Sequence, residues 1–149
     1  MAQSSTAFYT GLFRHTLDDK GRLTIPSAWR YAHEESDTFL AMPLAGYIAV
    51  LPPAEVVKLH EKISAAKLND ASTQAQAARF FAGTQTFSFD KAGRVILDAE
   101  LLERAGIKRD AVLVGSLTKF NIYSPARWKQ EHALAAKQDA GDLLNRLDI

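Results

Sequence analysis

The chain has 149 residues, no cysteine and a net charge of +1. The absence of cysteine excludes disulfides, thiolate catalysis and thiolate metal sites, and the near-neutral charge argues neither for nor against a nucleic-acid partner. The N-terminal residues lack the basic and apolar regions of a signal peptide, and no apolar run approaches the roughly 18 residues of a membrane span. We therefore expect a globular cytoplasmic protein with no membrane contact.

One sequence motif occurs twice. The pattern Asp-x-x-Gly-Arg spans residues 18–22 and again residues 90–94, an offset of 72 positions, and apolar strand-like residues follow each copy. Two further segments of the first copy have counterparts at an offset of 73, in residues 110–113 and 120–125. Such a duplication predicts pseudo-two-fold symmetry and a surface feature displayed in two copies. The repeated feature is a turn that carries an arginine.

The first copy predicts a turn, a short helix, two strands and a longer helix. Apolar residues on both sides of the turn predict a hairpin, in which Gly21 adopts a positive φ and Asp18 accepts hydrogen bonds across the bend. Pro26 marks the start of the short helix. The remaining predicted elements are the short helix over 27–32, strands over 38–41 and 47–51, and a helix opened by Pro52-Pro53 with an apolar stripe at Val56, Leu59, Ile63 and Leu68.

The second copy predicts the same order of elements after a polar connecting helix. Asp90 and Gly93 take the places of Asp18 and Gly21 in the turn. Asp98 stands where the first copy has Pro26 and is expected to cap the short helix. The remaining predicted elements are the connecting helix over 69–78 that ends near Ala82-Gly83, an end of the short helix at Gly106, strands over 111–115 and 119–123, and a final helix opened by Ser124-Pro125, with fraying of the last residues.

The two turn arginines are the first candidates for a binding site. Asp and Gly suffice to build the turn, so turn geometry does not explain arginine at the same position twice. The guanidinium fork suits phosphate oxygens and the O6/N7 edge of guanine; the alternative is a tight turn with a solvated arginine. The candidate DNA-binding residues are Arg22 and Arg94 with the nearby Lys20, Lys91 and Arg14, although Asp19 offsets part of the charge.

The sequence carries no recognisable catalytic or metal-binding pattern. Its four histidines lack metal-ligand spacing, no nucleophile elbow or phosphate-binding loop occurs, and no two carboxylates pair as an acid and a base. Trp29 and Trp128 are predicted to lie in the core or in a subunit contact. For Arg79-Phe80-Phe81, core packing is favoured over a role as a partner anchor. We therefore expect no enzymatic activity, no cofactor and no metal.

Taken together, the motifs resemble those of the MraZ family. The resemblance spans nearly the whole chain and rests on residues 9–11, 15–26, 79–83, 90–95, 112–115 and 120–128. It implies an α+β, mainly β fold of two tandem AbrB-like (SpoVT-AbrB) swapped-hairpin half-barrels that form one pseudo-two-fold domain with flanking helices. It also implies DNA contacts on the basic turns, at Lys20, Arg22, Lys91 and Arg94. Asp98 departs from the family pattern, which usually has proline there.

The same resemblance implies a bacterial transcriptional regulator. We expect a nucleoid-associated, sequence-specific DNA-binding repressor of the cell-division and cell-wall gene cluster. It would bind tandem repeats in double-stranded DNA upstream of its own gene as a ring-like homo-oligomer. The expected organisation is a first repeat over 8–68, a connecting helix and linker over 69–83, and a second repeat with the C-terminal helix over 84–149. Two alternatives stay open: an antitoxin-like protein that binds a toxin partner and DNA, and a scaffold protein whose arginine turns are incidental.

Overall fold

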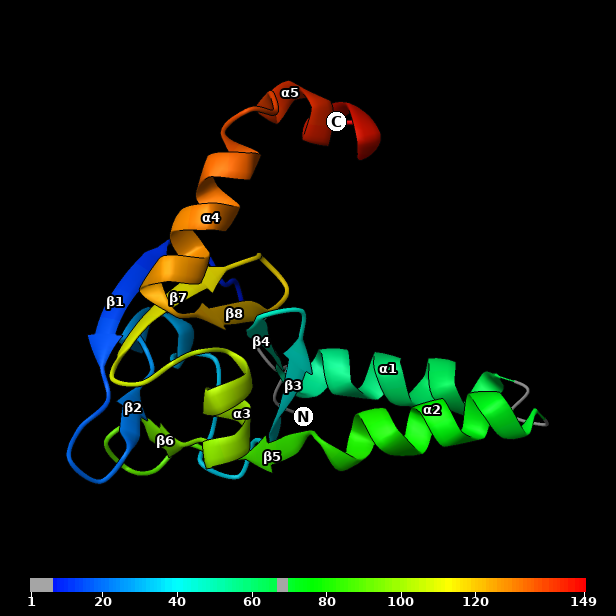
Figure 1. The fold of residues 1–149 in the computed structure, drawn as a ribbon, viewed down its shortest axis with the longest axis horizontal. Helices are drawn as coiled ribbons and strands as arrows, with labels where there is room; N and C mark the ends of the chain where they lie inside the picture. The colour runs from blue at the N-terminus through cyan, green and yellow to red at the C-terminus, as the bar shows by residue number, and fades with distance from the viewer. Residues whose placement is uncertain (1–6, 67–69) are drawn as a thin grey trace.

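The computed structural model describes residues 7–66 and 70–149 and has an α+β, mainly β architecture (Figure 1). The strands are β1 (Leu12–Thr16), β2 (Arg22–Thr24), β3 (Phe39–Leu44), β4 (Tyr47–Leu51), β5 (Gln85–Phe87), β6 (Arg94–Ile96), β7 (Asp110–Gly115) and β8 (Phe120–Tyr123). The helices are the 3-10 helix η1 (Ser27–Trp29), α1 (Pro53–Ala65), α2 (Ala71–Ala82), α3 (Ala99–Arg104), α4 (Pro125–Ala135) and α5 (Ala140–Arg146). Among the described residues, no helix combines the length and the apolar character needed to cross a membrane.

The strands form a six-stranded sheet and a separate two-stranded ribbon. The sheet has the order β1-β7-β8-β4-β3-β5, the ribbon consists of β2 and β6, and the pairs are antiparallel. The predicted pairs of strands in each copy are confirmed as the hairpins β3–β4 and β7–β8, which meet at the centre of the sheet through β4 and β8. The strand order therefore has the pseudo-two-fold symmetry that the duplicated sequence predicts.

The predicted hairpin around each Asp-x-x-Gly-Arg turn is wrong, because the two copies exchange strands. β1 pairs with β7 of the second copy, β5 pairs with β3 of the first, and β2 pairs with β6 across the copies. Leu23 and Val95 are direct partners in the ribbon and are 1% and 4% exposed, so the exchange buries an apolar residue of each copy. A local pattern predicts that a strand exists, but its partner is decided by long-range packing.

The core is built around aromatic side chains from both copies. Trp29 is 1% exposed, and its indole N–H donates to the Thr10 carbonyl oxygen at 2.9 Å. The Trp29 ring packs against the rings of Tyr9, Phe13 and Phe120, with centroids 6.0, 5.1 and 4.9 Å away. The prediction that Trp29 lies in the core is confirmed.

Helices α1 and α2 lie side by side and extend away from the sheet (Figure 1). Pro53 occupies the first turn of α1 as predicted, and Val56 and Leu59 pack against a cluster of buried residues on β3 and β4. Phe80 of α2 packs against the same cluster, which confirms the core-packing interpretation of its segment. The predicted apolar position Leu68 lies outside the described residues.

The connecting helix is confirmed as α2, which is capped by the Asp70 carboxylate and ends at Ala82, directly before Gly83. Ser124 caps α4 as predicted, its Oγ accepting a hydrogen bond from the Arg127 backbone N–H at 3.1 Å. Gly106, at φ 68°, follows the end of α3 as expected. Beyond α4 the chain forms a further helix, α5, which the sequence did not predict and which ends before the last three residues.

The prediction that the Asp98 side chain caps α3 by a hydrogen bond is wrong. Asp98 does occupy the N-cap position of α3, but its side chain makes no capping hydrogen bond. The Gln85 side chain instead connects the adjacent backbone, accepting from the Asp98 N–H at 2.7 Å and donating to the Ile96 carbonyl oxygen at 2.9 Å. The short helix of the first copy is also shorter than predicted, since η1 ends at Trp29.

Candidate nucleic-acid interface

The carboxylate of Asp18 organises the first turn. Its Oδ1 accepts hydrogen bonds from the backbone N–H groups of Lys20 and Arg22, at 2.9 and 2.8 Å. Its Oδ2 accepts a third bond from Arg22 Nε at 2.6 Å. Gly21 has a φ of 76°, which is the left-handed conformation that a glycine adopts without a Cβ clash.

The second turn repeats this network atom for atom. Asp90 Oδ1 accepts from the backbone N–H groups of Ala92 and Arg94, at 2.9 and 2.8 Å, and Oδ2 accepts from Arg94 Nε at 2.9 Å. Gly93 also has a φ of 76°. The duplicated motif thus produces two turns with the same internal hydrogen bonds.

Each turn arginine also contacts the turn that carries it. In both turns the arginine Nε forms an ion pair with the aspartate that opens the turn, so arginine takes part in the turn's structure. The pair uses one side of the guanidinium. Within the described part of the chain, the Nη groups of Arg22 and Arg94 have no recorded partner, which leaves a donor fork available on each turn.

The ribbon β2–β6 places both arginines on the same face. In its antiparallel register Arg22 pairs with Ile96, Leu23 with Val95, and Thr24 with Arg94. Successive side chains of a strand point to opposite faces, and Leu23 and Val95 point into the core. Arg22 and Arg94 therefore point outward together. As diagonal neighbours across an antiparallel pair, their positions are about 7–8 Å apart.

Hydrogen bonding lowers the pKa of both turn carboxylates. The main cause at Asp18 is the bond from the Arg22 backbone N–H, and the main cause at Asp90 is the bond from the Arg94 backbone N–H; burial opposes both. Because the folded-state pKa is depressed, the stabilisation is present above the ordinary carboxyl pKa of about 3.9 and is lost as pH falls through the lower folded value.

We therefore expect the turns to keep their shape from neutral pH down to the ordinary carboxyl range. Carboxyl ¹³C shifts measured against pH should give Asp18 and Asp90 midpoints below about 3.9. Backbone amide shifts of Arg22 and Arg94 should move with the same midpoints, because these amides donate to the titrating groups. Midpoints at or above the ordinary value would contradict the hydrogen-bonded turns.

The other predicted site residues lie in different surroundings. Lys20 and Lys91 are exposed on the two turns. Arg14 is exposed on β1, where it lines a shallow hollow with Asp110 and Pro125 near the start of α4. The structure thus brings the four turn cations to one end of the molecule and groups Arg14 with a separate hollow.

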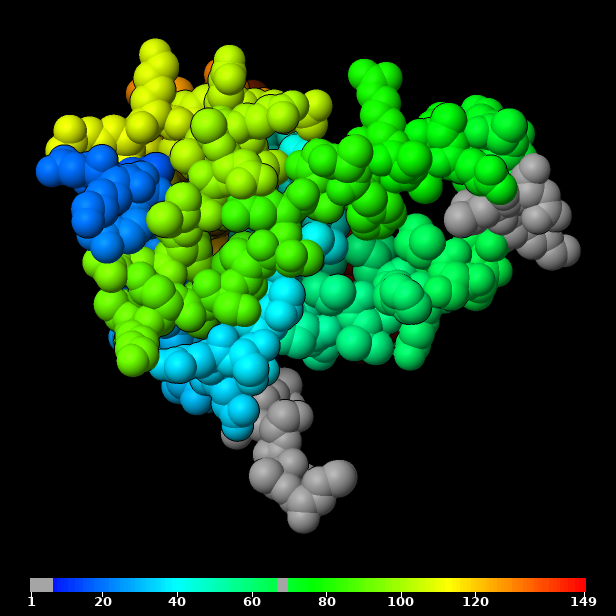
Figure 2. Space-filling model, turned by 90° about the horizontal axis from the view of Figure 1, so that it is seen from below, coloured from blue at the N-terminus to red at the C-terminus, as the bar shows by residue number. Residues whose placement is uncertain are grey.

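Two cations that the sequence analysis missed lie next to the first turn. The Leu17 N–H donates to the carbonyl oxygen of Arg109 at 2.8 Å, so the loop with Lys108 and Arg109 runs beside this turn. Both side chains are exposed. Figure 2 looks onto this end of the molecule, where blue atoms of the first copy lie against lime and yellow atoms of the second. A spatial neighbour this far along the chain leaves no local signal in the sequence.

The two turn glycines differ in their surroundings, although their φ angles agree. Around Gly21, no described residue other than its two chain neighbours places an atom within 4 Å of the position that a Cβ would occupy. A Cβ on Gly93 would lie 2.2 Å from Cζ of Arg30, whose side chain covers it. Gly93 is accordingly buried, whereas Gly21 is half-buried.

Alanine at the two glycines should therefore have unequal effects. Gly21→Ala should destabilise by about 1–2 kcal/mol, the usual cost of a left-handed conformation. Gly93→Ala should cost more, because its methyl group also displaces Arg30. Urea unfolding of both variants measures the difference, and the excess should vanish in an Arg30→Ala background. Equal costs for the two single variants would contradict the packing of Arg30 on Gly93.

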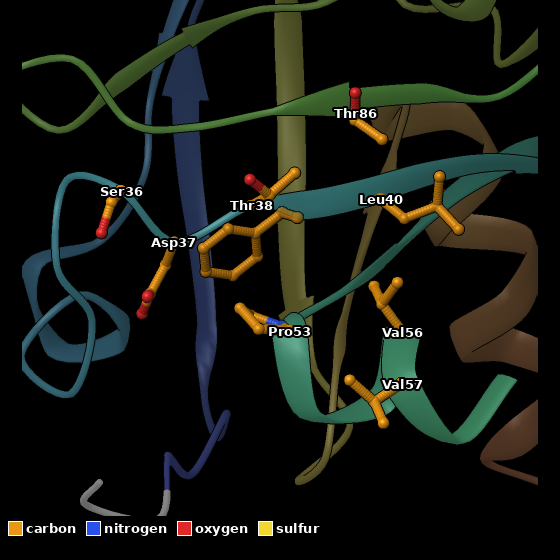
Figure 3. A pocket seen from close by; sticks show the side chains of 9 residues that line it. Ser36, Asp37, Thr38, Leu40, Pro53, Val56, Val57 and Thr86 are labelled. Atoms are coloured by element: carbon orange, nitrogen blue, oxygen red, sulfur yellow. The ribbon is translucent and has the colours of Figure 1, made fainter. Parts of the chain in front are cut away.

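The hollow in Figure 3 lacks the convergent polar groups of an active site. It lies between β3, β5 and the start of α1 and is lined mainly by apolar side chains, among them Leu40, Pro53, Val56 and Val57. Its one carboxylate, Asp37, accepts a hydrogen bond from His33 at 3.0 Å. We assign this hollow no chemistry.

His33 has a structural role. Its Nδ1 contacts Asp37, its Nε2 is hydrogen-bonded to the hydroxyl of Tyr9, and its ring packs against Phe39. Burial is the main cause that raises the pKa of Tyr9, with contributions from Asp37 and Tyr31, so this phenol stays neutral. In the described ranges, 7–66 and 70–149, no cluster of histidines and carboxylates could hold a metal ion.

Comparison with known proteins gives consistent matches. A family model described as "MraZ protein, putative antitoxin-like" matches residues 80–145. A protein of Thermomicrobium roseum named transcriptional regulator MraZ is 32% identical over 130 residues, which cover 87% of this chain and 91% of the relative. Proteins of the same name from Desulfitobacterium hafniense and Syntrophomonas wolfei are 37% and 31% identical, over 80% and 95% of this chain and 83% and 99% of their own lengths. The chain therefore belongs to the MraZ family.

Proposed function

We propose that this protein is a sequence-specific DNA-binding transcriptional regulator whose contact surface is the β2–β6 ribbon with its two turns. The observation that supports this most strongly is the outward placement of Arg22 and Arg94 on one face by identical turns. The naming of its relatives as transcriptional regulators agrees with it.

The geometry of each turn suits guanine recognition. The aspartate holds the arginine through Nε, which fixes the plane of the guanidinium and leaves its Nη groups to donate. Such a fork pairs with O6 and N7 of guanine in the major groove, which is wide enough to admit a two-stranded β-ribbon. The exposed Lys20 and Lys91 would contact phosphates, which provide affinity and register without reading sequence.

We further propose that the protein acts as a ring of identical subunits on directly repeated DNA elements. The elements would lie upstream of its own gene, in the cell-division and cell-wall gene cluster, and binding would repress transcription. Each subunit offers a small contact surface, and linked surfaces can exceed the affinity of one site by about 10²–10⁴ when their spacing permits simultaneous contact.

Changing the spacing of the repeats tests this proposal. Neighbouring subunits in a rigid assembly should read elements about one helical turn, or ~10 bp, apart. In a gel shift, insertion of about half a turn between two repeats should reduce affinity steeply, and insertion of a full turn, as the control, should reduce it much less. Equal binding to all three spacings would contradict reading by several subunits at once.

A further inference from the structure

Arg30 connects the first copy to the turn of the second copy. Its Nε–H donates to the carbonyl oxygen of Ile25 at 3.0 Å. The guanidinium lies against Gly93 so closely that a Cβ there would be 2.2 Å from both Cζ and Nη1. The contact is possible because glycine has no side chain at this point.

Ile25 holds the same turn from a second direction. Its N–H donates to the carbonyl oxygen of Gly93 at 2.9 Å. The backbone at Gly93 is thus bonded at its carbonyl by Ile25 and covered at its Cα by Arg30, and Arg30 is in turn bonded to Ile25. The second turn is therefore supported from outside by two residues of the first copy.

Among the described residues, the first turn has no counterpart of the Arg30 contact, although the Leu17 N–H beside it donates to the Arg109 carbonyl oxygen. The residue that corresponds to Arg30 in the second copy, at the offset of 72, is Leu102, which is half-buried and packs against the core. In the part of the chain that the structure describes, only the two chain neighbours of Gly21 can lie within 4 Å of a Cβ position on it. The two turns thus share their internal hydrogen bonds and differ in what holds them from outside.

We propose that Arg30 is a positioning residue, which holds the second turn in the geometry that presents Arg94 to DNA; this inference rests on the proposed function. A loop that is already in its bound conformation loses less freedom on binding. The second turn therefore meets the DNA preformed. Lysine cannot replace Arg30, because it lacks the planar fork that both packs on Gly93 and donates sideways to Ile25.

Hydrogen exchange of the free protein tests the support without any DNA. Arg30→Lys keeps the charge and removes the planar group. In this variant the amide of Ile25 and the amides of residues 92–94 should exchange about three- to ten-fold faster, since local openings of a turn are governed by the contacts that hold it. The amides of residues 20–22 should not change. Arg79→Lys is the matched control, because Arg79 is exposed on α2, a helix that extends away from the sheet (Figure 1).

Operator binding tests the positioning role. Arg30→Lys should bind operator DNA about three- to ten-fold more weakly with an unchanged salt dependence. Adding Arg30→Lys to Arg94→Ala should cause no further loss, because Arg30 acts through the turn that carries Arg94. Thermal unfolding with the same transition in all variants establishes that each one is folded.

The outcomes separate the alternatives. Unchanged exchange in Arg30→Lys would overturn the proposal, and so would faster exchange with unchanged affinity. If Arg30→Lys bound operator DNA as tightly as the parent while Arg30→Leu bound it weakly, Arg30 would be an ordinary cation contact. That result would also overturn the proposal. A parent protein that binds no operator DNA would refute the proposed function instead, and the exchange measurement would still decide whether Arg30 holds the turn.

Discussion

Arg22→Ala is expected to lose operator binding almost completely while it keeps its fold and assembly. A bidentate arginine–guanine pair contributes about 1–3 kcal/mol of discrimination, and every subunit of an assembly would lose the pair at once. The fold should tolerate the change, because the Arg22–Asp18 ion pair lies at the surface, where such pairs contribute little to stability. Gel shifts at several salt concentrations measure the loss.

The comparison variants define what the Arg22 result means. Arg94→Ala should weaken binding less, since Lys108 and Arg109 flank the first turn and the position of Lys20 is occupied by Ala92 in the second. Lys129→Ala removes an exposed charge on α4, far from the turns, and should bind like the parent. Circular dichroism and sedimentation serve as fold and assembly controls. A folded Arg22→Ala protein with parental affinity would contradict the proposed contact surface.

Trp29→Ala is expected to have the largest effect on stability. Trp29 is 1% exposed, and truncation of a buried tryptophan typically costs about 3–5 kcal/mol. The loss would leave a cavity among rings of both copies and an unpaired carbonyl oxygen at Thr10. Urea or thermal unfolding measures the effect.

Two further variants separate the contributions to this cost. Trp29→Phe keeps a ring in the core and loses the hydrogen bond to Thr10, so its cost should be smaller than that of Trp29→Ala. Trp128→Ala should also cost less, because Trp128 is only half-buried, against Tyr123 and His132 on one side of the sheet. If Trp29→Ala proved no more costly than Trp128→Ala, the central role of Trp29 in the core would be wrong.

Local signals in the sequence predicted most elements of the fold but not their pairing. Pro53, Ser124 and Gly106 mark helix ends by backbone chemistry that acts within a few residues, and all three predictions are confirmed. The hairpins β3–β4 and β7–β8 are also local. The exchange of β1 and β5 between the copies depends on contacts across the whole chain, which no short pattern encodes.

The candidate site was also predicted only in part, because some of its contacts are local in the sequence and others join distant parts of the chain. The duplicated motif identified both turns, because Asp and Gly there have a local geometric purpose. The ion pair between each turn arginine and its aspartate also joins residues close in the sequence. The spacing alone, however, does not indicate that the arginine side chain turns back onto the aspartate. Arg30 and Arg109 reach a turn of the other copy, and only the structure reveals them. The Gln85 side chain bonds the backbone before α3, and the expected cap by the Asp98 side chain is absent among the described contacts.

Footprinting of the protein on the DNA upstream of its own gene tests the central claim most directly. With competitor DNA present, the parent should protect a series of repeated elements spaced by about one helical turn, and Arg22→Ala at the same concentration should protect none of them. Protection that is absent in the parent, or that is identical in the folded Arg22→Ala variant, would contradict the account.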